Sequence, residues 1–133
     1  RFWIRLNQVA EFILKALVIM EGGEIFIPRM PSAKVIDVAN GVIRNDFLEK
    51  DKFETYLPPD IKEVGIRPGE KLHEILATEE EMNIATFRLD LNCYVIANKY
   101  CTNNNSILES YTSNTNPRWL NDGEIDRIIK EET

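Results

Sequence analysis

Five residues capable of acid, base or anion chemistry lie within eight positions of the chain. They are two cations, two carboxylates and the single histidine, namely Arg67, Glu70, Lys71, His73 and Glu74. Pro68 fixes a turn among them, and Gly69 permits a positive φ or a close backbone approach. A strand before this turn and a helical turn after it would direct unpaired backbone amides toward an anion.

This density of charge favours a phosphate site. The planar guanidinium of Arg67 can donate to two oxygens of a diphosphate. Glu70 has one of two complementary roles, because a carboxylate either accepts hydrogen bonds from the vicinal hydroxyls of a ribose or holds a guanidinium in place. The simpler alternative is a strand-to-helix turn whose charges are only solvated.

The remaining polar candidates favour binding over catalysis. General acid–base catalysis by His73 needs a positioned partner, and the sequence identifies none, so we expect a structural or surface role. Lys71 is expected to point into solvent. Arg1 precedes the strand-like Phe2-Trp3-Ile4 and is suited to face a phosphate, although alone it is only a terminal arginine.

Several common sites are missing from the sequence. It contains no Gly-x-Gly-x-x-Gly, no Gly-x-x-x-x-Gly-Lys-Ser/Thr and no Gly-x-Ser-x-Gly. Tyr94 and Lys99 are five residues apart, not the four of a short-chain dehydrogenase pair. Cys93 and Cys101 lack partners at metal spacing, so we expect no metal site and ordinary thiols of a reducing compartment. The sequence therefore predicts neither a cofactor cradle nor a catalytic base.

Composition limits the class of protein. The chain has 133 residues, 44% of them apolar, which is enough for one packed core. Sixteen Lys and Arg against 22 Asp and Glu give a net charge of −6, which argues against nucleic-acid binding through bulk positive potential. No apolar stretch approaches the roughly 20 residues of a membrane span. Because the chain opens at Arg1 inside an apolar element, we expect a fragment.

The elements that must position these residues follow from periodicity. Apolar spacing predicts a helix from Asn7 to Met20, stopped by two glycines, and then a strand over residues 24–27. Ser32 is expected to cap a second helix. The buried stripe of that helix would be Val35, Ile36, Ala39, Val42 and Ile43.

The second half of the chain predicts shorter elements. We expect a strand over residues 61–66, a helical turn from Leu72, and a helix that begins with the capping pattern Thr78 to Glu81. Residues 87–91 and 93–97 read as a hairpin, and an amphipathic helix follows Asn121. The sequence thus predicts a small mixed α/β domain of the kind that completes a larger enzyme.

Several stretches in combination resemble one family. They are Arg1-Phe2-Trp3-Ile4, the helix through Glu11-Phe12, and residues 22–28, 64–74, 94–96, 111–116 and 119–120. Nearly the whole chain is similar to the C-terminal part of the inverting UDP-N-acetylglucosamine 4,6-dehydratases. These enzymes belong to the extended short-chain dehydrogenase/reductase superfamily and serve polysaccharide and nonulosonic-acid biosynthesis.

The resemblance implies specific roles. Arg1 and Arg67 would hold the nucleotide diphosphate from two sides, and Glu70 would bind the uridine ribose. The family oxidises carbon 4 of the sugar with NADP, eliminates water across carbons 5 and 6, and returns the hydride to carbon 6 with inversion at carbon 5. Its catalytic and NADP-binding residues belong to a Rossmann half that is absent from this chain.

The resemblance also implies an organisation. Residues 1–133 would form the UDP-sugar-binding portion, with residues 103–133 as its tail and helix. Its partners would be the UDP-sugar, the Rossmann half and further copies in a cytoplasmic homo-oligomer. The chain departs from the family at Arg5, usually a small or hydroxyl residue, in the long charged stretch 39–60 and around Asn103. A related UDP-sugar epimerase, a retaining dehydratase and a truncated non-catalytic interaction module remain alternatives.

Overall fold

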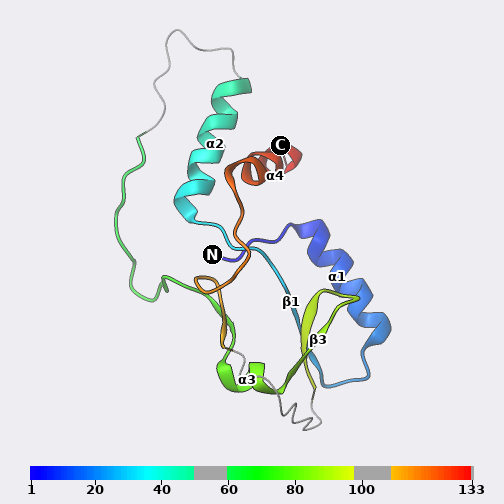
Figure 1. Cartoon of the computed structure of the whole chain (residues 1–133). Coiled ribbons are helices and arrows are strands. Elements are labelled where there is room, and N and C mark those ends of the chain that lie inside the picture. The colour runs from blue at the N-terminus through cyan, green and yellow to red at the C-terminus, as the bar shows by residue number, and fades with distance from the viewer. Residues whose placement is uncertain (50–59, 98–108, 133) are drawn as a thin grey trace.

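A computed structural model describes residues 1–49, 60–97 and 109–132 and has the small mixed α/β architecture expected from the sequence (Figure 1). Its elements in chain order are α1 (Leu6–Ile19), β1 (Ile25–Pro28), α2 (Val35–Glu49), β2 (Ile75–Ala77), α3 (Glu79–Ile84), β3 (Ala85–Arg88), β4 (Cys93–Ile96), β5 (Tyr111–Thr112) and α4 (Asp122–Glu132). Within the described residues, no helix is both long and apolar enough to cross a membrane.

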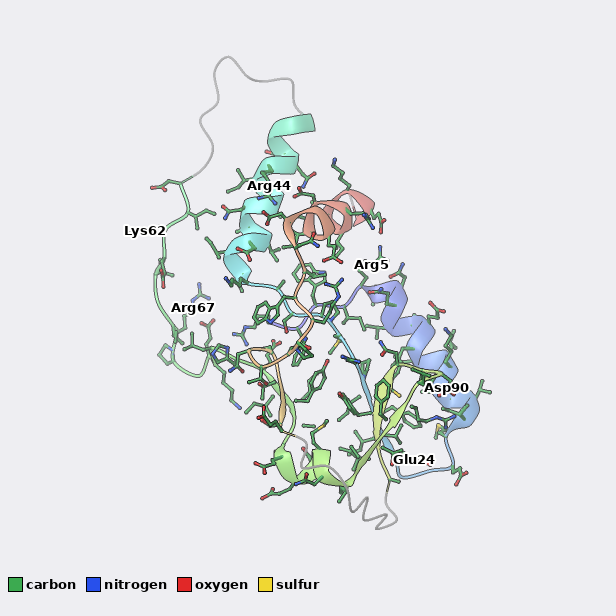
Figure 2. The ribbon with its side chains drawn as sticks, in the orientation of Figure 1. Arg5, Glu24, Arg44, Lys62, Arg67 and Asp90 are labelled. Carbon is green, nitrogen blue, oxygen red and sulfur yellow. The ribbon has the colours of Figure 1, made fainter. Side chains whose placement is uncertain are left out.

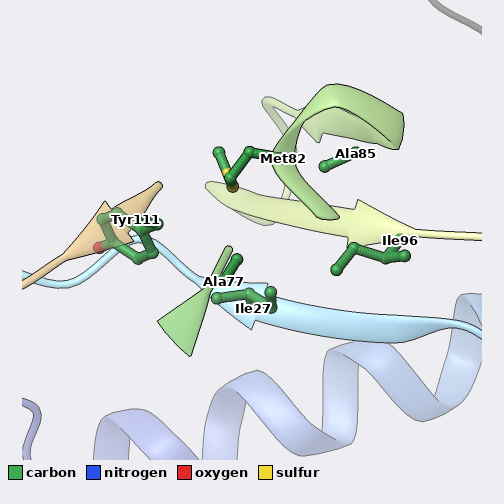
Figure 3. Packing of buried hydrophobic residues seen from close by; sticks show 6 residues of the cluster. All are labelled: Ile27, Ala77, Met82, Ala85, Ile96 and Tyr111. Atoms are coloured by element: carbon green, nitrogen blue, oxygen red, sulfur yellow. The ribbon is translucent and has the colours of Figure 1, made fainter. Parts of the chain in front are cut away.

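Two small antiparallel sheets meet at the core. The first has the strand order β1-β4-β3, with Ile27 opposite Tyr94, and the second pairs β2 with β5. The predicted hairpin is confirmed as β3 and β4, but its first strand is Ala85–Arg88 and not residues 87–91, because residues 89–92 form the turn. The core lies between the sheets and α3 (Figure 3) and consists of Ile27, Ala77, Met82, Ala85, Ile96 and Tyr111.

The predicted first helix is confirmed as α1, and it ends at Ile19, just before two glycines with φ angles of 112° and 87°. Its apolar side chains are not buried, however. None of its residues is in the core, and Leu14 and Val18 are 66% and 85% exposed. Helical spacing therefore predicted the helix correctly. Val9, Phe12 and Ala16 are half-buried, whereas most of the other apolar side chains of the helix are exposed.

Helix α2 packs on α4, but not through the stripe expected from the sequence. Val35, Ile36 and Val42 are exposed, and that prediction is wrong. The buried positions are Gly41 and Asn45, since α4 approaches α2 on the side of the glycine and places Ile125 against it. The predicted terminal helix itself is confirmed as α4, with Ile125 only 3% exposed.

Ser32 does not cap α2, contrary to expectation. Its side chain is fully buried, and its hydroxyl accepts a hydrogen bond from Asn116 Nδ2 at 3.0 Å. Its backbone lies between two segments, bridging Phe2 on one side and Trp119 on the other. Ser32 thus joins three segments that are far apart in sequence and cross near the centre of the molecule (Figure 1).

Residues 60–74 differ most from expectation. The strand predicted over 61–66 is absent, and the stretch is extended and exposed (Figure 1). The helical turn predicted from Leu72 is also wrong, because the chain enters β2 at Ile75 and pairs with β5. The capping box is confirmed: Glu81 N donates to Thr78 Oγ1 and Thr78 N donates to Glu81 Oε2.

Candidate functional site

The predicted anion-binding turn exists and closes on itself. Glu70 N donates to the Arg67 carbonyl at 3.0 Å across Pro68 and Gly69. The φ of Gly69 is 88°, and nothing would lie within 4 Å of an added Cβ, so the glycine is required by the backbone angle and not by space. Proline followed by a residue of positive φ is the pattern of a type II turn.

Glu70 stabilises this turn from outside. Its Oε2 accepts a hydrogen bond from Arg67 N at 3.1 Å, so the carboxylate holds the backbone of Arg67 and does not hold its guanidinium. The expected ribose contact of Glu70 stays a prediction. Because β2 and not a helix follows the turn, the helix amides expected to face an anion are missing.

The side chain of Arg67 extends into solvent. Arg67 is exposed, and in the part of the chain that the structure describes no carboxylate pairs with its side chain. Figure 2 places Arg67 on the extended stretch at one edge of the view. An exposed and unpaired guanidinium keeps its five donors for an incoming anion.

Arg1 belongs to a short extended segment that pairs with residues 31–33. The Arg1 carbonyl accepts from Ala33 N at 2.8 Å, and Trp3 N donates to the Pro31 carbonyl at 2.8 Å. The Arg1 side chain turns toward the end of the charged stretch, where its Nη1 lies 3.4 Å from Glu74 Oε1. The structure thus brings Arg1 to one end of residues 67–74, and Arg67 lies at the other end.

The role of Glu74 is one that sequence reasoning missed. Glu74 counted only as one of two carboxylates in a charged stretch, but its Oε2 accepts from Phe2 N at 2.9 Å while Oε1 faces Arg1. Its position near residue 2 depends on pairing across 72 residues, which no local pattern reports. The convergence of Arg1 and Arg67 on one diphosphate stays a prediction, and Glu74 is the observed link between their segments.

A second group of arginines lines a cavity of about 640 Å³ beside Trp3. They are Arg5, Arg29, Arg118 and Arg127. Arg5 pairs with Glu131, and Arg118 pairs with Glu124. Sequence reasoning missed this group, because its members come from three segments that are far apart in the sequence. Figure 2 shows Arg5 and Arg67 on opposite sides of the view, so the cavity and the turn are different places.

Charge pairing in this cavity strongly lowers the pKa of one carboxyl group, that of Glu124. The Arg118 guanidinium and the backbone N–H of Asn121 lower the pKa of the Glu124 carboxyl to about 2. Asn121 and Glu124 also form a reciprocal cap at the start of α4, since each backbone N–H donates to the other's side chain. Both acids of the cavity, Glu124 and Glu131, therefore form ion pairs within the protein.

The other candidates carry no visible catalytic arrangement. His73 and Lys71 are exposed. Tyr94 packs against the rings of Phe87 and Tyr111, and Lys99 and Cys101 lie outside the described residues. Burial raises the pKa of the Cys93 thiol. Among residues 1–49, 60–97 and 109–132, no three potential ligands gather to hold a metal ion.

Comparison with known proteins places the chain in a family. The family described as "Polysaccharide biosynthesis protein" matches residues 1–95, and the chain belongs to it. The resemblance found in the sequence is confirmed: the chain is 33% identical over 147 residues to an inverting UDP-N-acetylglucosamine 4,6-dehydratase of Campylobacter jejuni, covering 97% of this chain and 39% of the relative.

Two further proteins are similar to nearly the whole of this chain. The chain is 34% identical over 134 residues to a protein of Methanocaldococcus jannaschii described as an uncharacterized membrane protein, covering 98% of this chain and 38% of that one. The X-ray structure of Pen from Bacillus thuringiensis superposes with a TM-score of 0.75 and 28% identity, covering 100% of this chain and 37% of Pen. The chain therefore spans about two fifths of the length of these relatives.

Proposed function

We propose that this chain binds the nucleotide of a UDP-sugar within an NADP-dependent UDP-N-acetylglucosamine 4,6-dehydratase that inverts carbon 5. The similarity to the Campylobacter jejuni dehydratase supports the reaction class. One observation carries the binding role: an exposed guanidinium without a carboxylate partner in the described residues, Arg67, projects from a closed turn in a chain of net charge −6. A local cation in an acidic chain is suited to an anionic ligand.

In this proposal the two arginines bind and orient. Arg67 donates two N–H groups to oxygens of the diphosphate, and Arg1 donates from the side of Glu74. Glu70 uses Oε2 to hold the turn, which leaves Oε1 to accept from a ribose hydroxyl. Fixing the nucleotide in this way raises the effective concentration of the sugar at a reacting centre formed by other residues.

The described residues do not fit the dinucleotide cofactor of the proposed reaction. Dinucleotide sites depend on a glycine-rich turn between a strand and a helix. Here Gly65 and Gly69 lie in an exposed extended stretch that leads into a strand, and the sequence has no Gly-x-Gly-x-x-Gly. We therefore assign this chain no part in holding NADP, and no chemical step is derived through it.

The test is the affinity of the full-length protein for UDP, measured by isothermal titration calorimetry. Loss of a charged hydrogen bond is worth about 1.5–3 kcal/mol, so Arg67→Ala should weaken UDP binding by about 10- to 150-fold. Lys71→Ala is the matched control, because it removes a cation from the same exposed stretch and should change the affinity little. Equal losses in both variants would indicate only general electrostatics.

A second candidate, a non-catalytic interaction module, is favoured by α1. Six of its side chains or near neighbours are large, apolar and exposed: Leu6, Ile13, Leu14, Leu17, Val18 and Met20. Contiguous apolar surface of this kind marks contact with another chain or domain. UDP titration together with size-exclusion chromatography separates the two functions, because the module predicts association without nucleotide binding.

A further inference from the structure

Glu74 lies where three distant segments of the chain meet. Its backbone is fixed on one side by Ser113: Glu74 N donates to Ser113 Oγ at 3.0 Å, and Ser113 N donates to the Glu74 carbonyl at 2.9 Å. Ser113 is itself 1% exposed, so the backbone of Glu74 is attached to a buried residue. The main chain of Glu74 therefore has little freedom, and its side chain is aimed by the fold.

The carboxylate divides its two oxygens between two tasks. Oε2 accepts from Phe2 N at 2.9 Å, which fixes the backbone just after Arg1. The ring of Phe2 packs against the ring of Tyr111, and the two ring centroids are 4.8 Å apart. Oε1 faces Arg1 Nη1 at 3.4 Å. One carboxylate thus controls both the backbone and the guanidinium at residues 1 and 2.

The ion pair itself adds little to stability. The side chains of Arg1 and Glu74 are 35% and 42% exposed, and solvent screens the attraction of a pair this accessible. Its effect is on orientation, because a contact through one nitrogen leaves the other donors of a five-donor guanidinium available. Arg1 can therefore bind a phosphate oxygen while Glu74 still holds Nη1.

We propose that Glu74 is a positioning residue of the nucleotide site, which orients Arg1 for the diphosphate. This inference rests on the proposed function. Glu74 lies seven residues after Arg67, so a single stretch carries one diphosphate ligand and orients the other. Phosphate binding at Arg1 then depends on the Glu74 carboxylate, which is negatively charged like the ligand itself.

The negative charge of Glu74 makes the inference testable. Removal of a negative charge beside an anion site should by itself strengthen anion binding. If Glu74 positions Arg1, Glu74→Gln should instead weaken UDP binding, by about 5-fold, since an orientation worth about 1 kcal/mol is lost. Glu63→Gln is the matched control, an exposed carboxylate earlier on the same stretch, and it should leave UDP affinity unchanged or slightly tighter.

A double-substitution cycle in the full-length protein identifies the route. Glu74→Gln is measured by UDP titration in the wild type and in Arg1→Ala. The inference predicts a loss in the first background and no loss, or a gain, in the second, because the positioned group is gone. The same loss in both backgrounds, or tighter binding in the wild type, would overturn it.

The cycle also separates this inference from the function on which it depends. If Arg1→Ala and Arg67→Ala leave UDP affinity unchanged, the proposed function fails and the role of Glu74 fails with it. If both variants weaken binding but Glu74→Gln does not, only the positioning role is contradicted. A melting temperature for each variant shows whether Glu74→Gln acts through loss of folding, in which case the UDP loss would appear in both backgrounds.

Discussion

Gly41 of α2 lies directly against Ile125 of α4. A Cβ built on Gly41 would stand 2.7 Å from Ile125 Cγ2 and 2.9 Å from Ile129 Cδ1, closer than real side-chain contacts allow. Ile129 can rotate its terminal methyl away, but the branched Cβ of Ile125 is stiff. The two helices therefore approach each other as closely as they do because residue 41 has no side chain.

Gly41→Ala is expected to destabilise the protein. Alanine gains about 1 kcal/mol of helix propensity, whereas forcing a methyl into a filled contact costs about 1–3 kcal/mol, so the net loss of stability is up to about 2 kcal/mol. Thermal unfolding measures it. Gly123→Ala on α4 is the control, because its added Cβ would meet only Asn121 Oδ1 at 3.5 Å, and it should be neutral or stabilising. A Gly41→Ala variant as stable as the wild type would show that the helices separate freely.

Tyr111→Phe should also lower stability. The buried Tyr111 hydroxyl accepts from Met30 N at 2.8 Å and donates to the Met30 carbonyl at 3.1 Å. Asn116 Nδ2 still reaches that carbonyl at 2.8 Å after the substitution, but Met30 N loses its acceptor. An unsatisfied amide costs about 1–3 kcal/mol, and chemical denaturation should report a loss in that range.

Tyr94→Phe is the comparison for this loss. Tyr94 packs in the same aromatic group, 5.5 Å from Tyr111 between ring centroids. No hydrogen bond of its hydroxyl is found among the described residues, so removing it should change stability by less than Tyr111→Phe does. Equal effects of the two substitutions would show that the Met30 contacts of the Tyr111 hydroxyl add no stability of their own.

Glu124 should give α4 a pH dependence. Its pKa is lowered from an ordinary 4.5 to about 2, chiefly by the Arg118 guanidinium. A carboxyl with a lowered pKa in the folded state stabilises that state above its unfolded pKa, and the effect is lost as pH falls from about 4.5 toward 2. The melting temperature of the wild type should therefore exceed that of Glu124→Gln at pH 6, and the gap should narrow by pH 2.5. A gap that does not change with pH would contradict the role of the charge.

Local signals predicted the elements well. The capping box at Thr78 and the helical spacing of α1 and α4 are properties of a few adjacent residues, and the structure confirms all three. The strand expected over 61–66 failed, because alternation alone does not supply a neighbouring strand. The turn at Arg67 was predictable, since proline and glycine restrict the backbone in any context.

Long-range pairing decided what local signals could not. Ser32 had the type of a helix cap but became the buried crossing point of three segments, through partners at residues 2 and 119. The position of α4 determines which side of α2 is buried, and that side carries Gly41 and not the apolar stripe. Local periodicity does not report where α4 lies. Glu74 and the arginine cavity escaped notice for the same reason: each is assembled from segments separated by tens of residues.

The most direct test of the account compares UDP with uridine on the full-length protein and its Arg67→Ala variant. Uridine has the base and ribose but no phosphate, so an arginine that binds the diphosphate affects only the affinity for UDP. We predict that Arg67→Ala lowers UDP affinity by about 10- to 150-fold and leaves uridine affinity unchanged. Equal losses for both ligands, or no loss for UDP, would contradict diphosphate binding at the Arg67 turn.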